Sequence, residues 1–246
     1  NLLHPFQPFI VGQRQIGPKY AALHRVPLVF YGENQAEYGH NIQDNFKPIM
    51  APDFYEGDGS TRGVVLGGCT AEQLLTEHGL SLNDLEPYLP VLRDETRRCG
   101  AEVHYLSYYL RWDPQECYYY AAEHAGFCAN DERTEGSYSK YCSIDDRVDP
   151  FHYYTTLIKF GIGRATYDAA QEIRNGKITR EEGVALVERF DHEFPAKYFN
   201  EFLEYIDMPE PQFHHRIDRA RSPHLWCREG DAWRLRHAVW MEAHRQ

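Results

Sequence analysis

Only two segments of this chain carry the signals of a β-strand, and this shortage limits the folds that it can form. Residues 26–31, VPLVFY, are a short apolar run whose proline stands near the start, where a missing N–H is tolerated. Residues 102–110, EVHYLSYYL, are rich in aromatic and β-branched side chains. We therefore expect the chain to lack a complete parallel sheet and to be rich in helices.

Helix boundaries are marked by side chains that cap helix ends. The sequence contains two capping boxes, Thr70–Gln73 and Thr179–Glu182. Asp113 and Pro114 suit the start of a further helix, and Gly126 suits its end. The segments that we expect to contain helix are 17–25, 71–78, 114–125, 151–175, 180–189 and 196–206. Residues 39–68 and 128–150 are rich in turn-forming residues and predict long loops.

The acidic composition argues against some classes of function. The chain has 26 Lys and Arg against 37 Asp and Glu, which gives a net charge of −11. We expect no nucleic-acid partner, because such a surface needs clustered basic residues, although a local patch around Arg216, Arg219 and Arg221 stays open. No apolar run approaches the roughly 20 residues that a membrane span needs, and the N-terminal residues do not resemble a signal peptide.

The cysteines give no sign of a metal or redox centre. None of the six belongs to a CxxC pair, which argues against a zinc site or a redox motif. We expect reduced thiols and a cytoplasmic location, because disulfides are rare in that compartment. The scattered cysteines are Cys69, Cys99, Cys117, Cys128, Cys142 and Cys227.

An acidic pair follows the first strand, in the segment GENQAEYG. Gly32 allows the chain to turn close to a ligand, and Glu33 and Glu37 share one face if the segment begins a helical turn. Ligands of open α/β sheets bind beyond the carboxyl ends of strands, and carboxylates there can hold a Mg²⁺ ion that bridges phosphates. The alternative is a capped turn with solvated acids, which are common at helix starts.

A second candidate site is the junction KFGIGRATYD. Gly161 and Gly163 precede a helix whose free N–H groups could bind an anion, and Arg164 adds a guanidinium suited to phosphate or carboxylate. The alternative is a glycine-lined helix junction in which Arg164 pairs with an acid of the protein itself.

The segment 135–154 brings many polar side chains together. Lys140 or Arg147 could bind a charged substrate, while the acids and the histidine could act as acid–base groups or metal ligands. A turn with a helix cap explains the same acids, because Asp is common in turns. The acids and the histidine are Asp145, Asp146 and His152.

Several of these segments resemble segments of one protein family, and they occur in the same order along the chain. The sequence is similar to N-acetyl sugar amidotransferases of bacterial surface-polysaccharide (lipopolysaccharide and O-antigen) biosynthesis, which belong to the PP-loop ATP pyrophosphatase group. The matching segments are HPFQPFIVGQ (4–13), VPLVFYGENQAEYG (26–39), RWDPQECYYYAAEHAGF (111–127), the long stretch from RTEGSYSKYCSIDD to LVERFD (133–191), EFPAKYF (193–199) and RSPHLW (221–226).

The resemblance implies an α/β fold in two parts. Residues 1–50 would form the end of a Rossmann-like PP-loop nucleotide-binding domain, and residues 51–246 a mainly α-helical substrate-binding region. The SGGKDS-type phosphate loop and the cysteine-rich metal segment of the family are absent from this sequence. We therefore expect the chain to correspond to the C-terminal portion of such an enzyme, and we do not expect it to hydrolyse ATP alone.

The resemblance also implies a reaction. ATP with Mg²⁺ would activate the acetamido group of a nucleotide-linked N-acetyl sugar, and ammonia from a partner glutaminase subunit would convert it to an acetamidino group. Glu33 and Glu37 would bind Mg²⁺ and pyrophosphate or handle the protons of the incoming ammonia. Gly32 and Asn34 would contact the nucleotide.

An anionic group of the sugar substrate would bind at Arg164 with Gly161 and Gly163, and Lys140 and Asp145 are further candidates for substrate contact. On this hypothesis Arg164→Ala raises the apparent KM and leaves folding intact. Formation of a homo-oligomer stays open.

Two other functions compete with this one. A PP-loop enzyme of another class, such as a tRNA thiolase, would need a tRNA-binding surface and catalytic cysteines, which the charge and the scattered thiols do not favour. A non-catalytic sugar-nucleotide-binding or assembly subunit is favoured by the missing phosphate loop.

Overall fold

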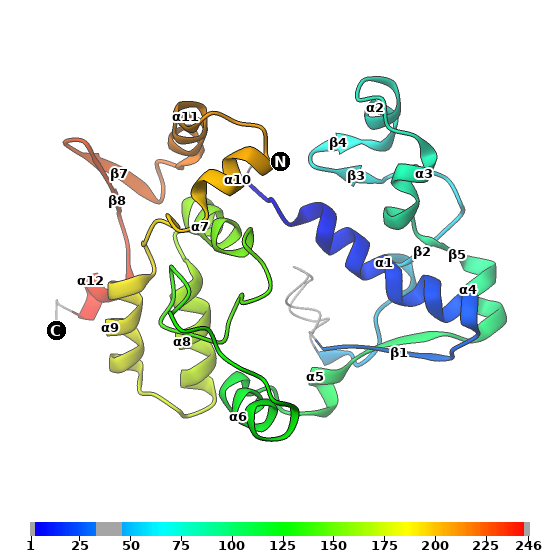
Figure 1. The fold of residues 1–246 in the computed structure, drawn as a ribbon, viewed down its shortest axis with the longest axis horizontal. Helices are drawn as coiled ribbons and strands as arrows, with labels where there is room; N and C mark the ends of the chain where they lie inside the picture. Colours follow the sequence, from blue (N-terminus) through cyan, green and yellow to red (C-terminus); the bar gives the residue numbers. More distant parts are fainter. Residues whose placement is uncertain (1–2, 33–45, 244–246) are drawn as a thin grey trace. The chain divides into compact units, whose positions relative to one another are not determined.

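The computed structural model describes residues 3–32 and 46–243, which belong to two compact units (Figure 1). We call residues Gln7–Trp112 the N-terminal unit, and Asp113–Gln246 together with Asn1–Phe6 the C-terminal unit. The domain boundary expected after residue 50 was drawn from the family resemblance. Compact units need not coincide with such domains, so this boundary stays a prediction.

The N-terminal unit mixes helices with short strands. Its helices are α1 (Gln7–His24), α2 (Ala71–Thr76), α3 (Leu82–Leu85), α4 (Arg93–Cys99) and α5 (Leu106–Tyr109), with 3₁₀ turns η3 (Pro52–Phe54) and η4 (Glu86–Tyr88). Its strands are β1 (Leu28–Tyr31), β2 (Glu56–Gly57), β3 (Val65–Leu66), β4 (Cys69–Thr70), β5 (Val91–Leu92) and β6 (Glu102–Tyr105). β1 pairs with β6 and β2 with β5 in parallel, whereas β3 and β4 are antiparallel.

Helix α1 begins ten residues before the helix expected over 17–25, and Pro18 lies inside it. A proline within a helix leaves the carbonyl four residues earlier without its N–H donor. Here the hydroxyl of Tyr31 donates to the carbonyl oxygen of Arg14 at 3.0 Å and to that of Gln13 at 2.8 Å. A side chain of β1 therefore compensates for the hydrogen bond that Pro18 cannot make.

The strand expected over 26–31 is confirmed as β1, but the strand expected over 102–110 is wrong in its second half. Val103 and Tyr105 of β6 point into a core, and the exposed residues that follow form the helical turn α5. On its other side β6 receives a hydrogen bond from the amide of Met50 to the carbonyl of Val103, at 2.8 Å. The core is formed by Tyr31, Met50, Tyr55, Val91, Val103 and Tyr105.

The C-terminal unit is mainly helical. Its helices are α6 (Pro114–Ala125), α7 (Asp149–Phe160), α8 (Arg164–Arg174), α9 (Arg180–Phe190), α10 (Phe199–Tyr205), α11 (Glu210–Ala220) and α12 (Val239–Ala243), and its strands are β7 (Trp226–Glu229) and β8 (Ala232–Leu235), an antiparallel pair. Both capping boxes are present, at α2 and α9. Asp113 caps α6, and Gly126 ends it in the left-handed conformation, as expected.

Aromatic side chains hold the core of the C-terminal unit. The rings of Phe151 and Phe202 stack with centroids 4.1 Å apart, and the indole N–H of Trp226 donates to the carbonyl of Ile158 at 2.9 Å. Arg221 was a candidate for a basic patch, but its guanidinium lies over the rings of Trp226 and Trp233 and pairs with Asp218. It therefore supports the packing of this core.

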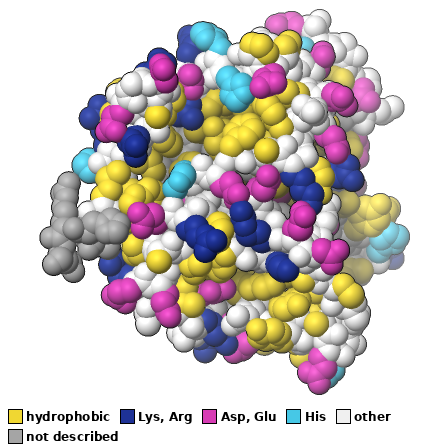
Figure 2. All heavy atoms as spheres, turned by 60° about the vertical axis from the view of Figure 1, so that its left-hand side comes forward, with side chains coloured by type: hydrophobic (Ala, Val, Ile, Leu, Met, Phe, Trp, Pro, Cys, Tyr) yellow, Lys and Arg dark blue, Asp and Glu magenta, His cyan; other side chains and the backbone are white. Residues whose placement is uncertain are grey.

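The mixed α/β class is confirmed, while a Rossmann-like PP-loop domain stays a prediction. All six cysteines are free. Within residues 3–32 and 46–243, no helix combines the length and the apolar character that crossing a bilayer requires. On the face shown in Figure 2, Lys and Arg side chains are interspersed with Asp and Glu side chains.

Candidate functional site

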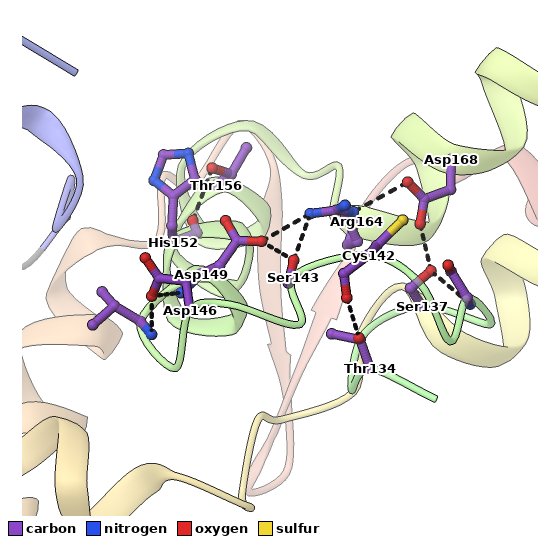
Figure 3. A network of polar contacts seen from close by, with 12 residues as sticks. Thr134, Ser137, Cys142, Ser143, Asp146, Asp149, His152, Thr156, Arg164 and Asp168 are labelled. Carbon is purple, nitrogen blue, oxygen red and sulfur yellow. Dashed lines mark hydrogen bonds and ion pairs between the residues drawn. The ribbon is translucent and has the colours of Figure 1, made fainter. Parts of the chain in front are cut away.

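Arg164 stands at the centre of a polar network in the C-terminal unit (Figure 3). It is the first residue of α8, and the loop before α7 passes beside it. Its Nε donates to Asp168 at 3.1 Å, and its Nη1 donates to Asp149 at 3.0 Å. The three side chains are 13–17% exposed, so these ion pairs are largely screened from water.

Each carboxylate of this network also holds the loop. Ser143 donates to Asp149, and Ser137 donates to Asp168. Nη1 of Arg164 donates to the hydroxyl of Ser143 as well, at 3.1 Å. The network therefore ties the loop to both α7 and α8.

The charges of the network shift the protonation of its members. Burial alone would lower the pKa of the Arg164 guanidinium, but the negative charges of Asp168 and Asp149 raise it above its ordinary value. Burial raises the pKa of the Asp149 carboxyl, and Arg164 and Ser143 oppose that rise. Arg164 is thus permanently charged, and its charge is compensated within the chain.

Two uncharged groups complete the surroundings of Arg164. The guanidinium lies over the ring of Tyr153, 4.2 Å from its centroid, which favours a cation–π contact. The thiol of Cys142 is partly buried beside it, and this burial raises the pKa of the thiol. A raised pKa disfavours the thiolate, so Cys142 is not activated as a nucleophile here.

The start of α8 binds an anion, but that anion is a side chain of the chain itself. The carboxylate of Asp191 accepts hydrogen bonds from the amides of Gly163 and Thr166, each at 2.8 Å, and from the hydroxyl of Thr166 at 2.9 Å. A Cβ on Gly163 would lie 2.5 Å from the backbone oxygen of Asp191. Glycine is needed for this close approach, and Gly161 ends α7 with a positive φ of 75°.

A second ion pair anchors an earlier part of the same loop, around Arg133 and Gly136. Arg133 donates to both carboxylate oxygens of Glu193, each at 2.6 Å, and the amide of Gly136 also donates to Glu193 at 2.8 Å. The hydrogen bond from Arg133 is the main cause that lowers the pKa of the Glu193 carboxyl. Bidentate pairs of this kind fix geometry as well as charge.

His152 packs against other rings, and burial favours its neutral form. The centroid of its ring lies 5.2 Å from the ring centroid of His4 and 5.3 Å from that of Phe6. Burial, with smaller effects of His4 and Lys159, lowers the pKa of His152 to about 4. Within the described part of the chain its Nδ1 has no hydrogen-bond partner.

The remaining polar residues of the segment 135–154 make separate contacts or are exposed. Asp146 accepts hydrogen bonds from the amides of Val148 and Asp149, as the turn interpretation predicts. Arg147 pairs with Glu201. Lys140 is exposed and donates to the backbone oxygen of Asp131 at 2.8 Å, and Asp145 is exposed.

The candidate nucleotide site after β1 falls mainly outside the described residues. Glu33, Asn34 and Glu37 lie there, and their roles stay predictions. Gly32 has no positive φ, and a Cβ added to it would meet no atom within 4 Å. Among the residues that the structure describes, no group of three or more His, Cys, Asp or Glu side chains could hold a metal ion.

The structure therefore brings together part of the predicted site. Arg164, Gly161 and Gly163 share one junction, and the ion pair to Asp168 could have been read from the i, i+4 spacing on α8. Asp191 and Glu193 were not predicted, because nothing local in the sequence connects them to residues about 28 and 60 positions earlier.

Comparison with known families gives one match. Residues 135–239, less than half of the chain, match the family described as "LPS biosynthesis protein WbpG-like, C-terminal domain". The matched segment contains Arg164 and both of its carboxylate partners. A search of curated proteins found no match. The family match supports a role in lipopolysaccharide or sugar biosynthesis.

Proposed function

We propose that this chain takes part in an ATP-dependent amidotransferase that converts the acetamido group of a nucleotide-linked sugar to an acetamidino group. The amide oxygen attacks the α-phosphorus of ATP and pyrophosphate leaves. Ammonia from a partner glutaminase then attacks the carbon of this adenylate, and AMP leaves with the oxygen. The observation that carries the proposal is the match of residues 135–239 to a lipopolysaccharide-biosynthesis family.

The polar network supports a positioning role for Arg164. Both of its carboxylate partners are internal, so direct contact with a substrate anion would require the displacement of Asp149 or Asp168. Likewise, an anion at the amides around Gly163 would have to displace Asp191. We therefore propose that Arg164 holds the loop on which the exposed residues Lys140 and Asp145 meet the sugar.

A reconstituted complex tests the proposal. The chain would be combined with a protein that carries an SGGKDS loop and with a glutaminase, and supplied with ATP, Mg²⁺, glutamine and UDP-linked N-acetyl sugars. We expect the exchange of one oxygen for NH in the sugar by mass spectrometry, together with release of AMP and pyrophosphate. Glu37→Gln should abolish this product, whereas Glu181→Gln, on the exposed surface of α9, should not.

The same experiment separates catalysis from binding alone. If the complex binds the UDP-sugar and never consumes ATP with any sugar tested, the chain is a binding or assembly subunit. If Glu37→Gln leaves full activity, Glu37 has no part in the site.

A further inference from the structure

A polar hollow of about 650 Å³ opens in the N-terminal unit where β2 and β5 end. The two strands are parallel, with Glu56 opposite Val91, so their carboxyl ends meet at one edge. Ligands of parallel sheets bind at such edges, because the connecting loops gather there. The lining residues are the last residue of each strand and residues that follow it: Gly57, Asp58, Ser60, Arg62, Leu92, Arg93, Asp94 and Arg98.

The loop after β2 makes a tight turn beside the hollow. Asp58 accepts a hydrogen bond from the amide of Ser60 at 2.8 Å, and Gly59 and Gly63 have positive φ values of 84° and 82°. Left-handed backbone at two positions favours glycine, because it has no Cβ to clash. The turn places Arg62 on the wall of the hollow.

The arginines of the hollow differ in how their charge is compensated. Arg93 pairs with Asp53 and Glu56, each at 3.3 Å. Arg62 and Arg98 are exposed, and within residues 3–32 and 46–243 neither forms an ion pair within 4.0 Å. Arg62 is close enough to Asp58 that, after the hydrogen bonds from Ser60, its charge also lowers the pKa of the Asp58 carboxyl. Among the described residues, the guanidinium of Arg98 donates through Nε alone, to the backbone oxygen of Asp94 at 3.0 Å, which leaves its Nη groups for a ligand.

A larger hollow of about 1100 Å³ adjoins the first and shares Leu92 and Arg98 with it. It lies between α1 and the segment from η4 to α4, elements that are neighbours in Figure 1. Its wall combines apolar side chains, among them Tyr20, Leu23 and Leu89, with charged side chains of both signs. Small-molecule sites typically combine apolar side chains with a few polar groups that fix the orientation of the ligand.

We propose that these adjoining hollows form a binding site for a nucleoside diphosphate. The diphosphate lies in the polar hollow, where Arg62 and Arg98 supply the N–H donors that phosphate oxygens accept. The nucleoside lies in the larger hollow, against the apolar side chains beside Tyr20, and Arg98 lines both hollows. Asp58 and Asp94 line the polar hollow too, and their charges oppose an anion, so binding depends on both unpaired arginines.

Titration calorimetry on the full chain at physiological salt tests this site with three probes: UDP, ADP and inorganic pyrophosphate. We expect wild-type protein to bind a nucleoside diphosphate, with UDP against ADP showing which base fits. Arg98→Ala and Arg62→Ala should each weaken nucleotide and pyrophosphate binding about tenfold or more, since each removes a charge-assisted contact. Tyr20→Ala should weaken the nucleotide and spare pyrophosphate.

Arg97→Ala is the matched control, because Arg97 is exposed on α4 next to Arg98 and lines neither hollow. It removes the same charge from the same helix and should leave binding unchanged. The proposal fails if wild-type protein binds neither nucleotide at ~1 mM, or if Arg97→Ala weakens binding as much as Arg98→Ala. Since no reaction is measured, this result is independent of the proposed amidotransferase activity.

Discussion

Arg164 and Arg98 are the same residue type in opposite surroundings. Arg164, in the C-terminal unit, is 13% exposed and pairs with two carboxylates of its own chain. Arg98, in the N-terminal unit, is exposed and lines a hollow, and its guanidinium donates to a backbone oxygen and to no other group in the described part of the chain. The sequence around Arg164 looks more like an anion site, but the structure leaves Arg98 the freer of the two to bind one.

The difference shows that a local motif does not identify an anion site by itself. A helix start preceded by glycines attracts any nearby negative charge, and in this chain Asp191 fills that place. An arginine becomes available to a ligand only when no internal carboxylate compensates for it. We therefore expect substitutions at Arg164 to affect stability and those at Arg98 to affect binding.

The largest effect is expected from Arg164→Met. The variant leaves Asp149 and Asp168 largely buried without their positive partner, which should cost roughly 3–5 kcal/mol of unfolding free energy. Urea denaturation at neutral pH measures it. The sequence-based expectation that folding stays intact without Arg164 is thereby revised, and a loss below about 0.5 kcal/mol would restore it.

Asp191→Ala should have the next largest effect. It removes the acceptor of three hydrogen bonds at the start of α8, and a lost cap with unsatisfied amides costs about 2–3 kcal/mol. The same denaturation experiment applies, with Asp145→Ala as the exposed control. Equal stability of the two variants would show that Asp191 does not hold the helix start.

His152→Phe should flatten the pH dependence of stability. The native pKa of about 4 lies below the ordinary value of 6.5, so the unfolded chain binds more protons between these values. Stability is therefore complete above about pH 6.5 and falls as the pH drops towards 4, by at most about 3 kcal/mol. Urea unfolding between these pH values should show a smaller fall for the variant, and an identical fall would exclude His152 as its source.

The smallest effect on stability is expected from Arg98→Met. An exposed side chain without an ion pair contributes within about 0.5 kcal/mol. Unfolding measured beside Arg164→Met gives the contrast directly. A loss of unfolding free energy as large as that of Arg164→Met would mean that Arg98 contributes to stability as much as Arg164 does.

The local parts of the fold could be predicted, and the distant ones could not. Thr70, Asp113 and Thr179 cap helices through residues three positions away, so their signals lie within one turn. The length of α1 could not be predicted, because the partner that compensates for Pro18 is Tyr31, on another element.

The site divides in the same way. Asp168 follows Arg164 at helical spacing, whereas Asp149 lies at the start of α7, 15 residues before Arg164. Arg62 and Arg98, on the wall of the polar hollow, are 36 positions apart in the sequence, and the parallel pairing of β2 with β5 brings their segments to one edge.

The most direct test of the account compares Arg164→Met with a triple variant that also carries Asp149→Asn and Asp168→Asn. If Arg164 serves to neutralise these two carboxylates, the unfolding free energy lost in the single variant should be largely regained in the triple variant, because no unpaired charge remains. A triple variant no more stable than Arg164→Met would contradict the account.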